Sequence, residues 1–248
     1  MSENLTNKVA LVTGSSQGLG AEIAKQLANE GCYVYVNCVH GIEKARMVVK
    51  EILAGGGASE IFECDITDEK VIMEKISKIK PVDILVNNAR LDPYNRGADD
   101  TEAGWFTKIL SVNLVGSYLA ILAVIDGMKE RRWGRIINIS SVQAHVAVPR
   151  KLIPYSASKA GMHALTRSFA IELAPYNITV NSVAPGMILT EGIGSRLSEK
   201  DIEERNERIP LHRGASCKET AQTVIDTIKA SYITGETVNI NGGLWLAP

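Results

Sequence analysis

Seven short apolar runs recur along the chain, separated by longer stretches with helical spacing. The runs are Val9–Val12, Tyr33–Val36, Ile61–Phe62, Ile84–Val86, Ile136–Ile139, Ile178–Asn181 and Thr237–Ile240. Several of them are apolar at successive positions, as expected for strands that helices cover on both faces. The alternation of strands and helices predicts an α/β fold: a doubly wound parallel sheet of seven strands with helices on both faces.

The length and composition are those of one globular domain, and we expect residues 1–248 to form it. The chain has 248 residues, of which 45% are hydrophobic and 22% charged. Neither a repeat nor a low-complexity tract nor a linker divides the sequence. A chain of this length buries roughly 70 to 75% of the surface that its unfolded form exposes, so its core needs neither disulfides nor metal.

The charge balance argues against nucleic acid and membranes as partners. Lys and Arg number 27 and Asp and Glu 28, a net charge of -1 that gives no overall field. The segment from Met1 to Lys8 lacks a basic region followed by an apolar stretch, so we expect no secretory signal and a cytoplasmic protein. The run from Ile109 to Ile125 is uncharged but contains polar residues and is short for a membrane span, which favours a buried helix.

The cysteines and histidines predict no metal site. The cysteines, Cys32, Cys38, Cys64 and Cys217, show no CxxC spacing. The histidines, His40, His145, His163 and His212, show no ligand spacing with them. We therefore expect the thiols to be small buried side chains in a reducing compartment.

A glycine-rich turn follows the first apolar run. It reads Thr13-Gly14-Ser15-Ser16-Gln17-Gly18-Leu19-Gly20, and Leu19, Ile23 and Leu27 then recur every four residues on one helical stripe. Glycine tolerates positive φ and has no Cβ, so the backbone can approach a pyrophosphate whose charge the helix N-terminus favours. The turn therefore indicates a nucleotide site of the Rossmann type, in the first βα unit of the chain.

Tyr155 and Lys159 stand four residues apart, directly after Pro154. Proline suits the first turn of a helix, so the two side chains should lie on one helical face. A phenol has a reference pKa of about 10, and a neighbouring ammonium favours its ionised form. Tyr155 could then exchange a proton with a substrate oxygen. The alternative is an incidental pair on a helix surface.

Together with the glycine turn, this pair makes the chain resemble the short-chain dehydrogenase/reductase family from about Lys8 to Leu246. Further motifs of that family occur in order: Asp65, Asn87-Asn88-Ala89, Asn113, Ser140-Ser141, Pro185-Gly186-Met187-Ile188-Leu189-Thr190 and Tyr232-Ile233-Thr234-Gly235. The resemblance implies a Rossmann-type domain that transfers a hydride between a nicotinamide cofactor and a small carbonyl or secondary alcohol. The hydride chemistry itself belongs to the cofactor.

The resemblance also implies roles for four catalytic residues. Tyr155 would be the general acid in carbonyl reduction and the base in alcohol oxidation, with Ser141 donating a hydrogen bond to the substrate oxygen. Lys159 would hold the nicotinamide ribose and tune Tyr155. Asn113 would position a water that carries protons to solvent.

The cofactor would contact residues from several of these motifs. Besides Tyr155 and Lys159, the implied set is Gly14, Ser16, Gln17, Gly18, Leu19, Gly20, Asn37, Asp65, Ile66, Asn87, Ala89, Pro185, Gly186, Ile188 and Thr190. Asp65 and Ile66 would flank the adenine, Asn87 and Ala89 the adenosine side, and Ile188 with Thr190 the carboxamide.

Some of these residues also have a purely structural interpretation. Asn113 could satisfy a backbone group inside an apolar helix, and Asp65 could cap the helix that follows it. Ser140 competes with Ser141 as the hydroxyl donor, and the second serine of such a pair is the usual choice in the family.

The chain departs from the family pattern at two points near the expected site. Ser141 precedes Tyr155 by fourteen residues where thirteen is usual, which predicts a one-residue insertion in the loop around His145 to Ile153. Arg90 stands where the family motif has glycine, and this places a bulky cation at the cofactor or its entrance.

The sequence favours NADP(H) over NAD(H). An NAD-preferring member normally has an acidic residue at the end of the second strand to bind the ribose 2′-OH, and the aligned residue is Cys38. No carboxylate follows before Glu43. NADP-preferring members often have arginine at the position of Val39 or a base at the position of Gln17, and neither is present. A strand ending in Asn37 without an acid resembles the NADP-using ketoacyl reductases, and NAD(H) is the alternative.

We expect the substrate pocket between the loop from Ser141 to Pro154 and a lid segment, residues 187–213. The middle of this segment is charged, which a solvated helical face explains better than substrate binding. Four side chains around the pocket could favour an anionic or polar substrate: Arg90, His145, Arg150 and Lys151.

Two other functions stay open. One is 3-oxoacyl-(acyl-carrier-protein) reductase, because Arg132 matches one of two basic positions used for carrier docking, while the second is Tyr176. The other is a non-catalytic cofactor-binding interaction protein, suggested by Arg90 and the shifted Ser141. The resemblance further implies a homotetramer, in which the tail around Trp245 packs near a subunit interface or within its own subunit.

Overall fold

The computed structural model describes residues 3–190, 192 and 197–247, and the predicted sheet is present within them. Seven strands of the described chain pair in parallel in the order β3-β2-β1-β4-β5-β6-β9. They are β1 (Val9–Val12), β2 (Tyr33–Cys38), β3 (Ala58–Glu63), β4 (Ile84–Asn87), β5 (Gly134–Ile139), β6 (Ile178–Pro185) and β9 (Thr237–Ile240). Each predicted run contributes to one of them, so the α/β fold is confirmed.

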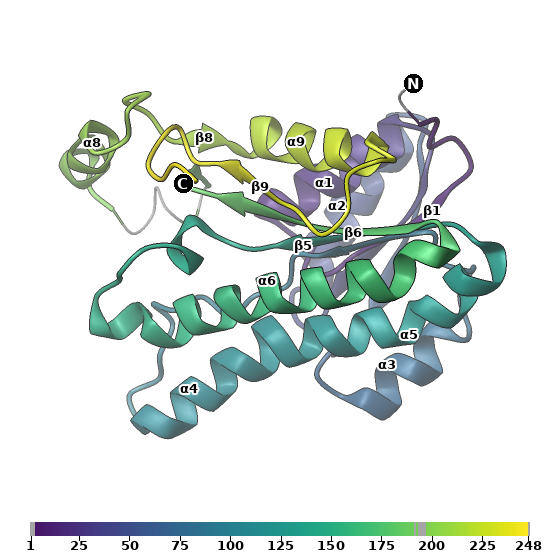
Figure 1. The fold of residues 1–248 in the computed structure, drawn as a ribbon, viewed down its shortest axis with the longest axis horizontal. Helices are drawn as coiled ribbons and strands as arrows, with labels where there is room; N and C mark the ends of the chain where they lie inside the picture. Colours follow the sequence, from purple (N-terminus) through teal and green to yellow (C-terminus); the bar gives the residue numbers. More distant parts are fainter. Residues whose placement is uncertain (1–2, 191, 193–196, 248) are drawn as a thin grey trace.

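Helices cover both faces of the sheet, with α1, α2 and α9 on one face and α3, α4, α5 and α6 on the other (Figure 1). The helices are α1 (Gly18–Asn29), α2 (Ile42–Ala54), α3 (Glu69–Ile76), α4 (Glu102–Leu110), α5 (Gly116–Arg131), α6 (Ile153–Leu173), α8 (Glu199–Glu207) and α9 (Cys217–Lys229). Strand order reverses between β1 and β4, and the crevice at such a switch point is where doubly wound sheets bind ligands.

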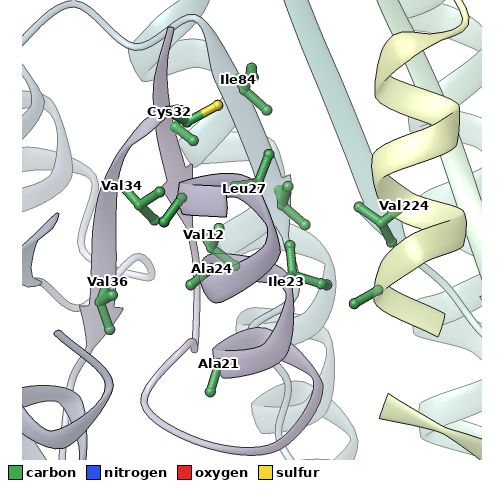
Figure 2. Packing of buried hydrophobic residues seen from close by; sticks show 14 of the residues in the cluster. Val12, Ala21, Ile23, Ala24, Leu27, Cys32, Val34, Val36, Ile84 and Val224 are labelled. Atoms are coloured by element: carbon green, nitrogen blue, oxygen red, sulfur yellow. The ribbon is translucent and has the colours of Figure 1, made fainter. Parts of the chain in front are cut away.

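Both faces of the inner strands β1, β2, β4, β5 and β6 are buried, which explains why several of the runs are continuously apolar, whereas the edge strands β3 and β9 are partly exposed. On β1, Ala10 and Val12 belong to the core under α1, whereas Leu11 belongs to the core under α5. Figure 2 shows the first core, where strand side chains pack against Ile23 and Leu27 of α1, with Val224 of α9 nearby. Full burial of each such side chain stabilises the fold by about 1.5 to 3 kcal/mol.

The apolar run from Ile109 to Ile125 lies in one long helical stretch, Glu102–Arg131, which is α4 and α5 joined by a π-helical turn at Ser111–Val115. The stretch is long and apolar enough to cross a membrane, but half of its most apolar window is buried inside the protein. It packs against α3 and α6. The prediction of a buried core helix is therefore confirmed.

The segment 187–213 leaves the sheet after β6. It begins with β7 (Ile188–Leu189), which pairs in parallel with β8 (Ala215–Ser216), a small sheet that the sequence analysis does not predict. Its charged middle forms α8, where the Ser198 capping box closes the N-terminus and no residue is buried. A solvated helical face is therefore the correct interpretation of that charge. Residues 191 and 193–196 lie outside the described residues.

Candidate active site and cofactor site

The predicted motifs meet along one edge of the sheet. Because the strands are parallel, the segments that follow β1, β4, β5 and β6 all leave from their carboxyl ends. The glycine turn follows β1, Asn88 and Ala89 follow β4, Ser140 and Ser141 follow β5, and Gly186 follows β6. Residues from widely separated parts of the sequence are thereby brought to a common edge.

The turn between β1 and α1 is fixed by hydrogen bonds from the neighbouring strands. The Thr13 hydroxyl oxygen accepts from the backbone N–H groups of Asn88 and Ala89, both at 3.0 Å. The Asn88 amide donates in turn to the carbonyl oxygens of Thr13 and Gly14, both at 2.9 Å. This network holds the start of the turn against the end of β4.

The glycines of the turn serve two different needs. Gly14 and Gly18 have φ of +59° and +58°, which favours glycine, and a Cβ on Gly18 would meet no atom within 4 Å. A Cβ on Gly20 would instead collide with the Asn88 amide and lie 2.6 Å from the Gly14 carbonyl oxygen. Gly18 therefore leaves open space at the start of α1, and Gly20 permits close packing.

The start of α1 fits a pyrophosphate. The N-cap residue, Gln17, makes no side-chain capping bond, and the first turn of this helix holds no acidic residue. The N–H groups at a helix N-terminus carry partial positive charge and bind anions. The predicted residues Ser16, Gln17, Gly18 and Leu19 surround this end of the helix.

Two predicted cofactor residues have buried side chains that are committed to the fold. The Asn37 amide oxygen accepts from the Gly14 N–H at 3.0 Å, and its nitrogen donates to the carbonyl oxygens of Phe62 and Cys64. The Asn87 amide nitrogen donates to Asn138 Oδ1 at 2.9 Å. Asn37 thus positions the glycine turn, whereas the buried amide oxygen of Asn87 has no hydrogen-bond partner among the described residues.

The two residues after β3 differ in exposure. The Ile66 side chain is buried, whereas Asp65 is exposed and its Oδ1 accepts from the N–H and hydroxyl of Thr67 at 2.9 and 2.7 Å. The suggestion that Asp65 caps the next helix is wrong, because Asp68 is the N-cap of α3 and accepts from the Val71 N–H.

The segment after β6 is held close to the C-terminal part of the chain. The Gly186 N–H donates to the Ile240 carbonyl oxygen at 2.9 Å, and a Cβ on Gly186 would lie 2.9 Å from Asn241 Cα. Pro185 is buried at the end of β6, while Ile188 and Thr190 are partly exposed beyond it. These four predicted residues therefore flank the active-site edge on the β6 side.

Tyr155 and Lys159 lie on one face of α6, as the spacing predicts. The Lys159 ammonium is 5.7 Å from the Tyr155 ring centroid and donates to the Ile139 carbonyl oxygen at 2.7 Å. Burial, with the charge of Arg90, lowers the pKa of Lys159 to about 7. Burial also raises the pKa of Tyr155, although Arg90 and a hydrogen bond with Ser141 act in the lowering direction.

The pKa of Tyr155 lies above the usual tyrosine value, opposite to the lowering expected from a neighbouring Lys159 ammonium. The reason is that burial disfavours the charged form of both groups. At neutral pH the phenol therefore keeps its proton in this structure.

The two serines after β5 have separate partners. The Ser140 hydroxyl is 2.6 Å from His163 Nε2 and donates to the Lys159 carbonyl oxygen at 3.3 Å. The Ser141 hydroxyl instead accepts from the Gln143 N–H at 3.2 Å, and its hydrogen bonding to Tyr155 acts to lower the pKa of that phenol. Ser140 is thus committed to α6 and Ser141 is the serine beside the phenol, as preferred from sequence. The loop between Ser141 and Tyr155 accommodates the extra residue without separating them.

Asn113 lies in the π-helical turn and its side chain is completely buried. Its Oδ1 accepts from the Leu91 N–H at 2.7 Å, and its Nδ2 donates to the Ser158 hydroxyl at 3.2 Å. Asn113 therefore does satisfy a backbone group, and it also joins the loop after β4 to the catalytic helix. A π-turn inside an α-helix frequently marks a functional site.

Hydrogen bonds hold the backbone on both sides of Arg90. The N–H of Ala89 is bound to Thr13 and that of Leu91 to Asn113, so the backbone on both sides of Arg90 is held. The Arg90 guanidinium pairs with Asp92 at 3.1 Å. Its positive charge acts to lower the pKa values of both Tyr155 and Lys159.

Ser140 contacts His163, which belongs to a cluster of rings that the sequence did not predict. The rings of His145 and His163 have centroids 4.7 Å apart, and Trp245 stacks on His145 at 3.8 Å. Burial lowers the pKa of His163 to about 4, so its ring is neutral near pH 7. His163 follows Lys159 by four residues, a spacing that could have revealed the shared face. Trp245 accordingly packs within its own subunit.

The residues described hold no group of three or more His, Cys, Asp or Glu side chains arranged for a metal ion. The arrangement at the edge of the sheet is instead that of a nucleotide turn beside a phenol, a hydroxyl and a buried amine. A phenol and an amine so arranged can exchange protons with a substrate oxygen.

The chain belongs to the short-chain dehydrogenase family, whose model matches residues 8–201. It is thus an oxidoreductase of the short-chain dehydrogenase/reductase class, a class that uses nicotinamide cofactors. The chain is 39% identical over 246 residues to a 3-oxoacyl-(acyl-carrier-protein) reductase from Staphylococcus epidermidis, which covers 97% of this chain and 100% of that protein.

Solved structures share the whole architecture. One, a 3-oxoacyl-(acyl-carrier-protein) reductase from Brucella melitensis, superposes with a TM-score of 0.89 at 27% identity and covers 98% of this chain and 93% of that one. Another, a proposed gluconate dehydrogenase from Agrobacterium tumefaciens, has a TM-score of 0.91 at 28% identity, with 97% of each chain covered. The fold is therefore common to relatives whose named substrates differ.

Proposed function

We propose that this oxidoreductase transfers a hydride between NADP(H) and a small carbonyl or secondary alcohol, with Tyr155 as the general acid and base. The observation that supports it most is the meeting of Tyr155, Ser141 and Lys159 beside the glycine turn. The three come from two elements, the end of β5 and the helix α6. An incidental surface pair is disfavoured because Lys159 is only 1% exposed.

In carbonyl reduction the reacting oxygen lies against Tyr155 and Ser141. A bound nicotinamide would supply the hydride to the carbonyl carbon, which would leave negative charge on the oxygen. Ser141 donates a hydrogen bond to this oxygen, and Tyr155 delivers its proton there. The raised pKa of Tyr155 suits this direction, since the phenol is protonated at neutral pH.

Lys159 and Asn113 have supporting roles in this proposal. The Lys159 amine holds the nicotinamide ribose, and with a pKa of about 7 it can carry a proton in part at neutral pH. Asn113 positions a water through which protons reach solvent. Its side chain already connects the loop at Leu91 with Ser158 on α6.

The proposed preference for NADP(H) rests on the end of β2. No carboxylate stands from Asn37 to Ile42, and the Asn37 amide is committed to the glycine turn and to β3. The 2′-OH of NAD(H) therefore lacks the acidic partner that NAD-preferring members provide. The residues that would hold the rest of the cofactor are those at the start of α1, with Ala89, Ile66 and Ile188.

A second candidate is reduction of 3-oxoacyl groups on a carrier protein, which is the named activity of the 39% identical relative. At the expected docking surface, Arg132 Nη2 donates to the Pro175 carbonyl oxygen at 2.9 Å. Tyr176 occupies the second of the two expected basic positions. The Lys129 ammonium lies 5.6 Å from the Tyr176 ring centroid. Lys129 also pairs with Glu172 at 3.0 Å, which compensates its charge.

The remaining expectations are part of the same proposal. The chain would act as one catalytic domain, 1–248, in a cytoplasmic homotetramer. Residues 187–213 would close over the substrate as a lid. Met187 and Leu211 of this segment line a cavity of about 110 Å³ together with Asn241.

The decisive experiment follows the absorbance of the reduced nicotinamide with both cofactors. The substrates are ketones, keto acids, keto sugars, and 3-oxoacyl groups on a simple thioester and on a carrier protein. We expect turnover of a small carbonyl that Tyr155→Phe abolishes. Preference for the carrier-bound substrate, lost in Arg132→Glu but not Arg96→Glu, would select the second candidate. No turnover in either direction despite saturable NADPH binding would contradict both.

A further inference from the structure

A lysine outside the family motifs reaches the glycine turn. Lys44, in the first turn of α2, donates from Nζ to Gln17 Oε1 at 2.7 Å. Gln17 is the N-cap residue of α1, and its side chain is exposed on the glycine turn. The two residues are 27 positions apart in the sequence, so only the fold brings them together.

The position of Lys44 follows from how α2 is docked. Gly41 has φ of +75°, which lets the chain turn sharply between β2 and α2. Ala45, Val48 and Ile52 are buried and fix the inner face of the helix. Lys44 directly precedes Ala45, the first of these buried residues, and its side chain extends to Gln17 at the start of α1.

The ammonium of Lys44 keeps its positive charge uncompensated. Among the described residues its partner is the neutral Gln17 amide and no carboxylate pairs with it. The nearest acid in the sequence, Glu43, is paired with Arg46. An ammonium has three hydrogen-bond donors, so Lys44 can bind an anion while it still contacts Gln17.

We infer that Lys44 and Gln17 together recognise the 2′-phosphate of NADP(H). The inference rests on the proposed function, and it explains how the chain can prefer this cofactor without a basic residue at position 17 or 39. Lys44 on α2 brings the basic group to the position of Gln17. A dianionic phosphate gains from this ammonium, whereas the neutral 2′-hydroxyl of NAD(H) gains little.

The test measures binding and needs no turnover. NADPH, NADH, 2′,5′-ADP and 5′-ADP are titrated against the intact protein by calorimetry, in wild type, Lys44→Met and Lys44→Arg. Lys50→Met is the matched control, because it removes the same charge from the same helix. We expect Lys44→Met to raise the dissociation constants of NADPH and 2′,5′-ADP by about tenfold. The dissociation constants of NADH and 5′-ADP should change by less than about twofold. Lys44→Arg should retain most of the affinity.

The outcomes separate this inference from the proposed function. If wild type prefers NADPH but Lys44→Met and Lys50→Met bind it equally well, the role of Lys44 is wrong and the cofactor choice stands. If wild type binds NADH more tightly than NADPH, the proposed cofactor choice itself fails. Equal melting temperatures of the variants would exclude unfolding as the cause of weaker binding.

Discussion

The two halves of the proposed active-site edge, one for the cofactor and one for catalysis, are built from different kinds of groups. The cofactor half, at β1, β2 and β4, consists of glycines, backbone amides and buried side chains such as Asn37, whose hydrogen bonds stay within the protein. The catalytic half, at β5 and α6, buries titratable groups, and the pKa of Lys159 is lowered to about 7 there. The cofactor half provides a shape that fits the cofactor, and the catalytic half determines which groups carry protons. Substitutions in the two halves should therefore affect different measured quantities.

The largest expected effect is the loss of the phenol in the catalytic half. Tyr155→Phe removes the proton donor and should lower kcat by about 100-fold to 10,000-fold, the usual contribution of a general acid. The dissociation constant of NADPH should change by less than about twofold, because the cofactor half is intact. Steady-state kinetics with parallel fluorescence titration measures both quantities.

The control is Tyr232→Phe, which removes a hydroxyl from a fully exposed tyrosine. It should leave kcat and cofactor binding unchanged. A Tyr155→Phe variant that keeps more than about a tenth of the activity would show that another group donates the proton.

The neighbouring serines offer a comparison within the catalytic half. Ser141→Ala removes the donor to the reacting oxygen and should lower kcat by about 100-fold, as loss of such a donor does. Ser140→Ala breaks the contacts with His163 and the Lys159 carbonyl, so it should reduce the free energy of unfolding by about 1 to 3 kcal/mol. Kinetics and denaturant unfolding of both variants test this, and equal catalytic losses would refute the assignment of Ser141.

Adding one methyl group to the glycine turn should have a smaller effect, on cofactor affinity. Gly20→Ala places a Cβ against the Asn88 amide and 2.6 Å from the Gly14 carbonyl oxygen, so the turn must move. We expect NADPH affinity to fall by about tenfold, in line with 1 to 3 kcal/mol for overpacking. Gly55→Ala is the control, since its nearest atoms are 3.5 Å away. Unaltered affinity in Gly20→Ala would mean that the turn tolerates displacement.

The same contrast explains what the sequence could predict. Apolar runs identified all seven strands of the sheet, and the signal is strongest for the inner strands, which are buried on both faces. The glycine turn and the pair Tyr155 and Lys159 were predictable for a similar reason, since each is a short motif whose spacing has a direct geometric meaning.

Other features depend on contacts between distant residues and left no local signal. The π-turn at Ser111–Val115 interrupts an apolar run without a proline or a change of period. The pair of β7 and β8 has two residues in each strand, too few for a recognisable alternation. The raised pKa of Tyr155 reflects burial, which the spacing to Lys159 does not report. The contact of Lys44 with Gln17 likewise exists only in three dimensions.

The smallest effect concerns the cation that lies between the two halves. Arg90 follows the cofactor-side segment, yet its charge lowers the pKa values of Tyr155 and Lys159. Arg90→Gly, which restores the usual residue of the family, should raise the pKa of Tyr155. Alcohol oxidation needs the ionised phenol, so the rise of kcat/KM with pH should move to higher pH. Carbonyl reduction, which needs the protonated phenol, should persist to higher pH as well.

The pH profiles of both directions distinguish this electrostatic role from a steric one. Arg96→Gln is the control, because Arg96 lies on the same loop but pairs with Glu102 and affects neither catalytic pKa. A lower rate without a displaced profile would mean that Arg90 shapes the entrance only. A displaced profile with unchanged NADPH affinity would show that its charge belongs to the catalytic half, although its backbone is anchored in the cofactor half.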